Sequence, residues 1–309
     1  MPAMPHLLAA VLLLGSPGAF AAETPAGFRK TATPGEFQVR TGTLEGLLRA
    51  GGRSQGLAPL HHAATETSIA AAPGIFNYYR VFTTNHRHGE SMRGAPSEAR
   101  LLSPNTVEVT WPPAEDRPFR LTGRYTWAEP GVLDLETTVE ARKPLPGFEV
   151  FLAAYFAAGF PAGAVYSKVE NGPPAFVTAE HSGGVWQVFP KDSAASELIH
   201  DGRWAIPPSP VEWRTTAEFA APLAYRRNPK TGVTAIVMAP PDDCFAVFTP
   251  ERGEGHRSLY LSLFGRTIAK EETARARARF AAGTGFEEDD IVRLYQDYTT
   301  QLTEVEAKE

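Results

Sequence analysis

Several side chains that can transfer protons lie in one short stretch, residues 75–89, which reads IFNYYRVFTTNHRHG. An imidazole donates and accepts a proton near neutral pH, and a tyrosine hydroxyl can serve the same transfer. In an extended segment His86 and His88 share one face, and Arg87 lies on the other. A His61–His62 pair precedes this stretch, and only one of its members can face a given cleft. The residues predicted to be catalytic are His61, Tyr79, His86 and His88.

Other side chains could bind a ligand without reacting with it. A guanidinium or amide group can neutralise a carboxylate or bind a hydroxyl group, and an aromatic ring can stack on the apolar face of a ligand. Three tryptophans, Trp186, Trp204 and Trp213, stand near Gly, Pro or charged residues, which favours exposure; packing inside the fold is the alternative for each. The residues predicted to bind a substrate are His62, Asn77, Arg80, Arg87, Trp186 and Trp213.

Two other interpretations of the histidines stay open. A His-x-His pattern on a strand can chelate zinc, and His61 or His62 would then be a third ligand. No carboxylate at a fitting spacing accompanies these histidines, so we predict neither a metal site nor a cofactor. In the second interpretation, residues 85–89 form a polar turn whose imidazoles are solvated.

The elements that must position these groups are β-strands. Residues 107–156 contain four runs, VEVTW, FRLTGRYTW, VLDLETTVEA and FEVFLAAYF, in which apolar or β-branched residues largely alternate with polar ones. This period of two places alternate side chains on opposite faces of a sheet. Turn-forming residues rich in Pro, Gly and Asp separate the runs. The pattern predicts an antiparallel meander with one face in water, which the rest of the chain extends or covers.

Length and composition are those of a protein with a large apolar core. The chain has 309 residues, of which 43% are hydrophobic and 21% are charged, and its net charge is −5. No basic stripe dominates, which argues against a nucleic-acid partner. Large β folds often form one unit at this length, so we predict a single domain over residues 37–309. The single cysteine, Cys244, allows no intrachain disulfide and is expected to be a buried apolar residue.

The first residues have the features of an export signal. Residues 7–14 form an apolar run too short to span a bilayer, and Ala19 and Ala21 then provide the small residues that a signal peptidase reads. We expect a signal peptide over residues 1–21, a flexible lead-in over residues 22–36, and an exported protein that is periplasmic or extracellular. No stable membrane insertion is expected after cleavage, because no longer apolar run follows.

The C-terminal residues follow a helical period instead. Thr284 and Glu287 match a capping box, and the acidic residues at 287–290 suit the positive end of a helix dipole. We predict an amphipathic helix over residues 286–305 that lies on the β-sheets. The residues expected on its apolar face are Ile291, Leu294, Tyr295, Tyr298, Leu302 and Val305.

The order of these segments resembles a known family. The segments that carry the resemblance are WPP at 111–113, FRLTGRYTW at 119–127, VLDLETTVEA at 132–141 and LYLSLFGRTIAKEETARARARF at 259–280. Over about residues 37–283 the chain resembles the β-supersandwich of galactose mutarotase-like proteins. The resemblance implies an all-β fold, a large antiparallel β-sandwich, and a carbohydrate as the ligand. Epimerases of this family use a His acid and a Glu base in a cleft on one sheet; histidines are present here, but no Glu can be matched to a position.

Two functions are therefore expected. The first is an exported protein that binds or processes an oligo- or polysaccharide, as an epimerase or polysaccharide lyase that uses His and Tyr for proton transfer. The second is a non-catalytic module of the cell envelope that binds glycans or has a structural role. An enzyme should bring at least two of the predicted histidines together beside an acid or a tyrosine in a concave cleft. A binding module should show an exposed aromatic platform without such a convergence.

Overall fold

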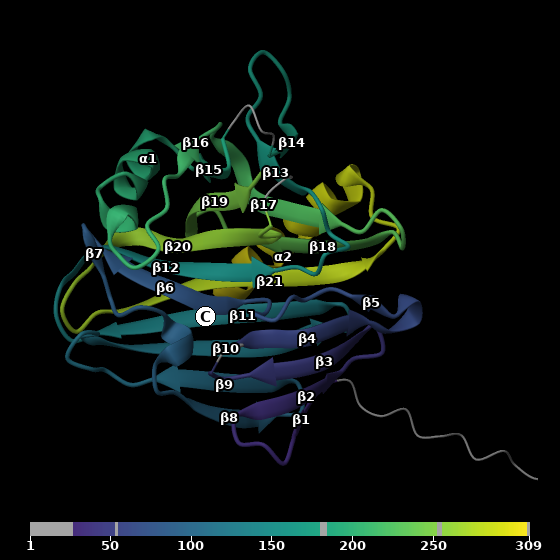
Figure 1. Cartoon of the computed structure of the whole chain (residues 1–309), viewed down its shortest axis with the longest axis horizontal. Helices are drawn as coiled ribbons and strands as arrows, with labels where there is room; N and C mark the ends of the chain where they lie inside the picture. The colour runs from purple at the N-terminus through teal and green to yellow at the C-terminus, as the bar shows by residue number, and fades with distance from the viewer. Residues whose placement is uncertain (1–26, 53–54, 180–183, 252–254, 308–309) are drawn as a thin grey trace, which may run out of the picture.

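The computed structural model describes residues 27–52, 55–179, 184–251 and 255–307. Most of these residues lie in β-strands, which form three largely antiparallel sheets (Figure 1). The five-stranded sheet contains, in spatial order, β1 (Gly27–Lys30), β2 (Glu36–Arg40), β3 (Leu44–Arg49), β4 (Gly56–His62) and β5 (Thr67–Ser68). Residues 1–26, which hold the predicted signal peptide, lie outside the described residues.

The two larger sheets make up the rest of the β structure. The nine-stranded sheet has the order β14 (Ala175–Thr178), β13 (Gly163–Ser167), β17 (Phe219–Arg227), β18 (Val233–Met238), β21 (Thr273–Thr284), β11 (Val132–Ala141), β10 (Phe119–Glu129), β9 (Thr106–Trp111) and β8 (Glu98–Ser103). The seven-stranded sheet has the order β16 (Arg214–Thr215), β15 (Trp186–Pro190), β19 (Cys244–Pro250), β20 (Ser258–Ile268), β12 (Leu145–Tyr155), β6 (Asn77–Thr83) and β7 (His86–Arg87).

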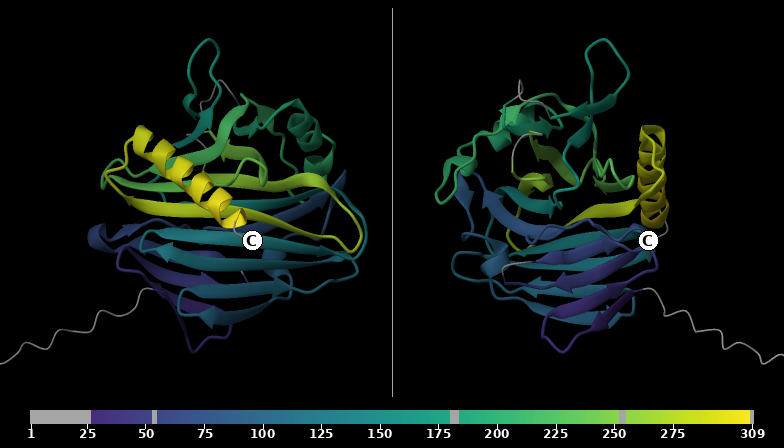
Figure 2. Two further views of the ribbon diagram at one scale, coloured as in Figure 1. Left: turned by 180° about the vertical axis from the view of Figure 1, so that it is seen from behind. Right: turned by 45° about the vertical axis from the view of Figure 1, so that its right-hand side comes forward.

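The nine-stranded sheet packs against both other sheets. Its β8–β9 edge contacts β1 of the five-stranded sheet, and β17, β18 and β21 contact β19 and β20 of the seven-stranded sheet (Figure 2). One apolar core joins all three sheets, with Phe37, Leu135 and Leu261 as representatives of each. The all-β sandwich predicted from the sequence is therefore confirmed. Cys244 lies in this core, as expected, and burial raises the pKa of its thiol to about 12.

The predicted meander is correct for three of its four runs. Strands β9, β10 and β11 pair in sequence order, and buried residues alternate with more exposed ones along β10. The fourth run leaves the meander, because β12 pairs with β6 and β20 in the other large sheet. Every residue from Phe148 to Tyr155 is buried, so this strand has no wet face. A nearly continuous apolar run of this kind suits a strand that is covered on both sides.

Two terminal predictions need correction. The expected flexible lead-in overlaps β1, which pairs with β2 from Gly27 to Lys30 and buries Phe28 against the Trp127 ring at 5.9 Å. Helix α2 (Glu288–Glu306) begins two residues later than predicted, and its capping box uses Glu287 and Asp290 rather than Thr284. No described helix is both long enough and apolar enough to cross a membrane.

Helix α2 lies on the outer face of the nine-stranded sheet, as the yellow helix in Figure 2 shows. Its buried residues Ile291 and Tyr298 pack on Leu223, Ile236 and Met238. Strand β21, which carries Arg275, Arg277 and Arg279, lies between β18 and β11 in the middle of the sheet.

The outer face of the seven-stranded sheet is covered only in part. Helix α1 (Ser193–Ile199), the short 3-10 helix η4 (Arg203–Ala205) and the residues up to β16 lie over one side of it (Figure 1). Two other 3-10 helices, η1 (Ala63–Thr65) and η2 (Met92–Gly94), are connections between strands. The segment from α1 to β16, residues 193–215, is called the cover below.

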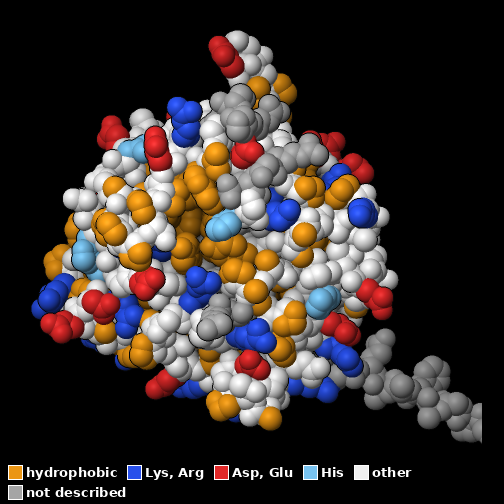
Figure 3. Space-filling view, in the orientation of Figure 1, with side chains coloured by type: hydrophobic (Ala, Val, Ile, Leu, Met, Phe, Trp, Pro, Cys, Tyr) orange, Lys and Arg blue, Asp and Glu red, His pale blue; other side chains and the backbone are white. Residues whose placement is uncertain are grey.

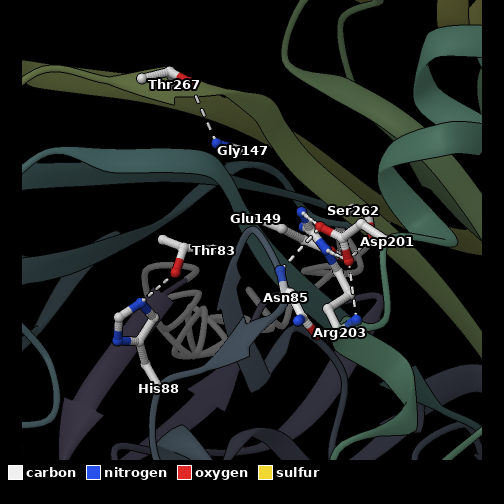
Figure 4. Close-up of polar contacts among 9 residues, drawn as sticks. All are labelled: Thr83, Asn85, His88, Gly147, Glu149, Asp201, Arg203, Ser262 and Thr267. Atoms are coloured by element: carbon white, nitrogen blue, oxygen red, sulfur yellow. Dashed lines mark hydrogen bonds and ion pairs between the residues drawn. The ribbon is translucent and has the colours of Figure 1, made fainter.

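A buried ion pair fixes the cover to the sheet. Glu149 on β12 and Arg203 on η4 both have fully buried side chains, and Arg203 Nη1 lies 2.8 Å from Glu149 Oε2 (Figure 4). Ser262 Oγ donates to the second carboxylate oxygen at 2.5 Å, and Arg203 also contacts Asp201 at 2.8 Å. Burial raises the pKa of Glu149, and Arg203 and Ser262 oppose this increase.

We predict that Arg203→Met lowers the free energy of unfolding by about 3–5 kcal/mol, because Glu149 would be left buried without its cation. The measurement is urea denaturation followed by tryptophan fluorescence. The double variant Glu149→Gln/Arg203→Met should be more stable than Arg203→Met alone, because it removes the unpaired charge.

Arg266→Met is the matched control, since its ion pair with Glu272 lies on the surface. It should change the stability little. Equal stability of Arg203→Met and Arg266→Met would contradict the role given to the buried pair.

Candidate functional site

The uncovered part of the seven-stranded sheet is a hollow lined by aromatic rings. Figure 3 shows this depression over the middle of the sheet, with hydrophobic side chains on its floor. The rings pack in contact: Phe151 and Tyr260 stack at 4.6 Å between centroids, and Trp186 lies 5.6 Å from Trp213. We call this site the aromatic hollow, and its rings are Tyr79, Phe151, Tyr155, Trp186, Trp204, Trp213, Phe248 and Tyr260.

A β-bulge in β6 brings two predicted site residues onto this face together. Arg80 pairs with Phe151 and Tyr78 pairs with Leu152, so Tyr79 is an extra residue without a partner on β12. Tyr78 points into the core, where its hydroxyl lies 2.6 Å from Thr137 Oγ1. Regular alternation would separate Tyr79 from Arg80, but the bulge lets both side chains face the hollow.

Two guanidinium groups flank the ring of Tyr79. Arg80 Cζ lies 4.8 Å from its centroid and Arg93 Cζ lies 5.3 Å from it. Arg80 is 3% exposed, and its Nη2 donates to the Tyr79 hydroxyl at 3.3 Å and to the Ser209 carbonyl at 2.8 Å. Its Nε and Nη1 are buried and have no hydrogen-bond partner. Arg87 donates to the carbonyls of residues 207 and 208, so both Arg80 and Arg87 hold the cover.

A pocket of about 260 Å³ lies within the cover beside two tryptophans of the hollow. The indole nitrogens of Trp204 and Trp213 are buried and have no hydrogen-bond partner. Both tryptophans thus line the pocket, and each has a buried N–H donor without an acceptor. The residues that line the pocket are Ile199, His200, Gly202, Trp204, Ala205, Pro210, Val211, Glu212 and Trp213.

Sequence reasoning missed several residues of the hollow. The exposed ring of His256 lies 5.5 Å from Trp186 and 6.3 Å from Tyr155. Ser258 Oγ donates to the Tyr260 hydroxyl at 2.7 Å, and burial raises the pKa of both Tyr155 and Tyr260. These two phenols thus stay protonated at neutral pH. Tyr155 ends the predicted FEVFLAAYF run and Tyr260 begins the closing strand, but only the pairing of β12 with β20 places them together.

The predicted histidines of β7 face away from the hollow. Arg87 pairs with Phe82 of the outer face, which leaves His86 and His88 on the opposite side of the strand. Their rings lie 4.6 Å apart, and the buried His88 ring packs on Phe119 of the nine-stranded sheet at 5.2 Å. The prediction that His86 and His88 share one face, opposite Arg87, is therefore correct. Their expected convergence with Tyr79 and Arg80 is wrong, because β10 occupies the side on which they lie.

His88 has a structural role at this end of the sheet. Its Nδ1 lies 2.8 Å from the Asp116 carbonyl, which can only accept, so Nδ1 carries the hydrogen. Its Nε2 lies 3.2 Å from Thr83 Oγ1 and accepts from that hydroxyl (Figure 4). The imidazole thereby links β6 to the loop that precedes β10. Burial lowers the pKa of His88.

His61 and His62 belong to the five-stranded sheet, on β4, and not to the sheet that carries the hollow. His62 is buried, its Nδ1 lies 2.9 Å from Thr65 Oγ1, and burial lowers its pKa. Thus the four predicted catalytic residues occupy three separate places. Among the described residues, no group of three His, Cys, Asp or Glu side chains is arranged to hold a metal ion.

Besides Arg80 and Arg87, three more predicted binding residues lie on the outer face of the seven-stranded sheet. Trp186 is half-buried, and Trp213 is buried among five other rings of the hollow or its floor. Asn77 pairs with Ala153 of the outer face, and its Nδ2 donates to the Pro73 carbonyl at 2.6 Å. Asn77 is fully buried, so its amide supports the preceding turn.

Comparison with known proteins relates this architecture to solved structures. No protein-family model and no curated protein sequence matches the chain. A protein from Synechocystis sp. PCC 6803 has a TM-score of 0.50 and 11% identity, with 82% of this chain and 97% of that chain covered. A galactose mutarotase-like protein from Lactobacillus casei ATCC 334 has a TM-score of 0.49 and 10% identity, with 81% and 100% covered. The chain shares its overall fold with the Synechocystis protein.

A third similar structure is an α-N-acetylgalactosaminidase from Bifidobacterium bifidum, with a TM-score of 0.49 and 12% identity over 88% of this chain and 38% of that chain. Identities of this size concern the fold alone. The large antiparallel β-sandwich predicted from the sequence is confirmed, and the properties of its hollow must be derived from the residues of this chain.

We predict that the protein loses stability on acidification and that His88 contributes to this loss. The folded-state pKa of His88 lies below the ordinary value of 6.5, so protonation favours the unfolded chain. The contribution of neutral His88 to the free energy of unfolding is complete above about pH 6.5. It is lost as the pH falls through the lowered folded-state pKa. Urea midpoints measured on both sides of this pH should show a smaller difference for His88→Gln than for the wild type.

His86→Gln serves as the control, because His86 is the exposed neighbour of His88. It should keep the wild-type pH dependence. The same dependence in His88→Gln as in His86→Gln would show that the buried imidazole is not one of the titrating groups.

Proposed function

We propose that this protein binds a carbohydrate in the aromatic hollow. The observation that supports this proposal best is the set of rings on the outer face of the seven-stranded sheet, with Trp186 and Tyr79 half-buried and therefore accessible. The apolar face of a sugar ring stacks on such side chains and removes their surface from water. An accessible apolar floor of this kind, open beside the cover, is typical of a surface that binds an apolar face of a ligand.

Polar groups beside the rings suit the hydroxyl groups of a sugar. The indole N–H groups of Trp204 and Trp213 and the guanidinium of Arg80 have buried donors without partners. His256 stands at the rim next to Trp186. A ligand site commonly combines a mainly apolar lining with a few such donors, which set the orientation of the ligand.

The positions of the predicted histidines favour a binding function over catalysis by these imidazoles. Epimerase or lyase chemistry with His61, His86 and His88 needs these side chains beside the ligand, and they lie on another sheet or on the opposite side of β7. Glu149, a carboxylate on the outer face, does not provide a base either, because Arg203 and Ser262 occupy both of its oxygens. The geometry therefore supports a glycan-binding module best.

We predict that the purified protein binds members of a glycan array and that Trp186→Ala weakens the tightest interaction about tenfold, or ~1.4 kcal/mol. The reason is the loss of the most accessible stacking surface of the hollow. Isothermal titration calorimetry with the selected oligosaccharide measures the dissociation constants of both proteins. Thermal unfolding of the variant checks that it is folded.

Phe176→Ala is the matched control, because Phe176 is a half-buried aromatic residue packed on Tyr166 and Tyr225 in the nine-stranded sheet. It should bind like the wild type. Absence of binding to every glycan of the array, or equal affinities of Trp186→Ala and Phe176→Ala, would refute the proposed site.

We also propose that the protein is exported and that residues 1–21 are removed. The support is the apolar run at 7–14 and the small residues Ala19 and Ala21. Expression of the whole chain in a Gram-negative host should yield a periplasmic protein whose N-terminal residue, determined by mass spectrometry, is Ala22. Replacing Ala19 and Ala21 with Arg should leave the precursor uncleaved, and an intact N-terminus on the wild-type protein would contradict the proposal.

A further inference from the structure

We propose that the ligand of the aromatic hollow is an anionic sugar, one that carries a uronate carboxylate or a sulfate ester. This inference rests on the proposed function and adds the charge of the ligand to it. The residues that carry it are Arg80 and Arg93, whose guanidinium carbons lie 4.8 and 5.3 Å from the centroid of the Tyr79 ring.

Neither guanidinium has a counter-charge in the structure. Among the residues that the structure describes, no Asp or Glu oxygen lies within 4.0 Å of Arg80 or Arg93. Arg93 Nε only contacts Ser91 Oγ at 3.4 Å, and Arg80 binds a phenol and a carbonyl. Two other buried arginines differ: Arg203 is paired with Glu149 and Asp201, and Arg279 is paired with Asp134, whereas Arg87 donates to carbonyls of the cover.

The buried state of Arg80 makes this lack of a counter-charge significant. A cation removed from water without a partner is costly, and so is each buried donor that lacks an acceptor. Arg80 is 3% exposed, yet its Nε and Nη1 have no acceptor. Arg226 is also buried without a carboxylate, and its Nε lacks a partner, but both of its Nη atoms donate, to Phe160, Thr249 and Ser258 oxygens, whereas Arg80 has two donors without partners. An anion bound in the hollow would offset the cost at Arg80.

The two arginines have different roles in this arrangement. Arg93 is half-buried on η2, which packs against β6, and it lies next to the Tyr79 ring, so it can touch an acidic group of the ligand directly. Arg80 lies deeper, between the rings of Tyr79 and Trp204, at 4.8 and 5.2 Å. Its charge is poorly screened by water there, so it favours an anion in the hollow even without direct contact.

The test compares matched ligands that differ only in charge. The probes are a hexagalacturonate and the same oligosaccharide with its carboxyl groups reduced to hydroxymethyl groups, and a sulfated hexasaccharide with its desulfated counterpart. Calorimetry should give at least about tenfold tighter binding of the anionic member of one pair. This preference should decrease when the ionic strength rises from about 0.05 to 0.5 M, because salt screens the charges.

Arg93→Gln should remove most of the preference for the anionic probe, measured as the ratio of the dissociation constants of the neutral and the anionic member of the pair. Arg80→Gln should act in the same direction, and thermal unfolding checks that its cover is still held. Arg275→Gln is the control for net charge, because Arg275 is exposed on β21 of the other sheet. It should keep the wild-type preference.

The outcomes separate this inference from the proposed function. A tighter uronate or a tighter sulfated probe supports the inference and identifies the acidic group. Equal affinities for charged and neutral probes overturn the inference but leave the sugar site intact. An unchanged preference in Arg93→Gln overturns the assignment to these arginines. If none of the four probes binds and the glycan array is also empty, the proposed function itself fails.

Discussion

The carboxylate of Glu149 imposes the constraint on which the site depends. It lies on β12, on the outer face of the seven-stranded sheet, where a charge without a partner would be very costly. Arg203 meets this requirement and fixes the cover above one side of the sheet. Arg80 and Arg87 then bind carbonyls of residues 207–209 from the sheet side. Arg203 thus anchors the cover at residue 203, and Arg80 and Arg87 anchor it at residues 207–209. Together these three arginines set the border between the covered and the open part of the face.

The sequence predicts those features that depend on neighbouring residues. Alternation gave β9, β10 and β11, and the apolar period gave α2, because these patterns state which side of one element is buried. It could not give the partner of β12 or the bulge at Tyr79, because both depend on pairing between segments about seventy residues apart. The bulge is decisive for the site, since without it Tyr79 and Arg80 would face opposite sides.

The histidines also show what local alternation cannot predict, namely which side of a strand is left open in the fold. Local alternation correctly places His86 and His88 together and Arg87 opposite. Which of the two sides is open is decided by β10, whose Phe119 covers His88, and by the cover, which binds Arg87. Trp186 and Trp213, predicted to bind a ligand, both lie in the aromatic hollow, Trp186 half-buried and Trp213 buried. Imidazoles are less informative, since a buried one can equally serve as a hydrogen-bond link.

Arginines at this outer face therefore fall into two groups, those with partners for their charge or donors and those without. Arg203 is neutralised by two carboxylates, and Arg87 donates its hydrogen bonds to carbonyls of the cover. Arg80 is buried as deeply but keeps two free donors, and it lies beside accessible rings and a second arginine without a counter-charge. A buried donor without an acceptor calls for an explanation, and a functional site is one of the places where proteins tolerate it. Arg80 lacks an anionic partner, and the rings next to it form a surface on which a sugar can stack.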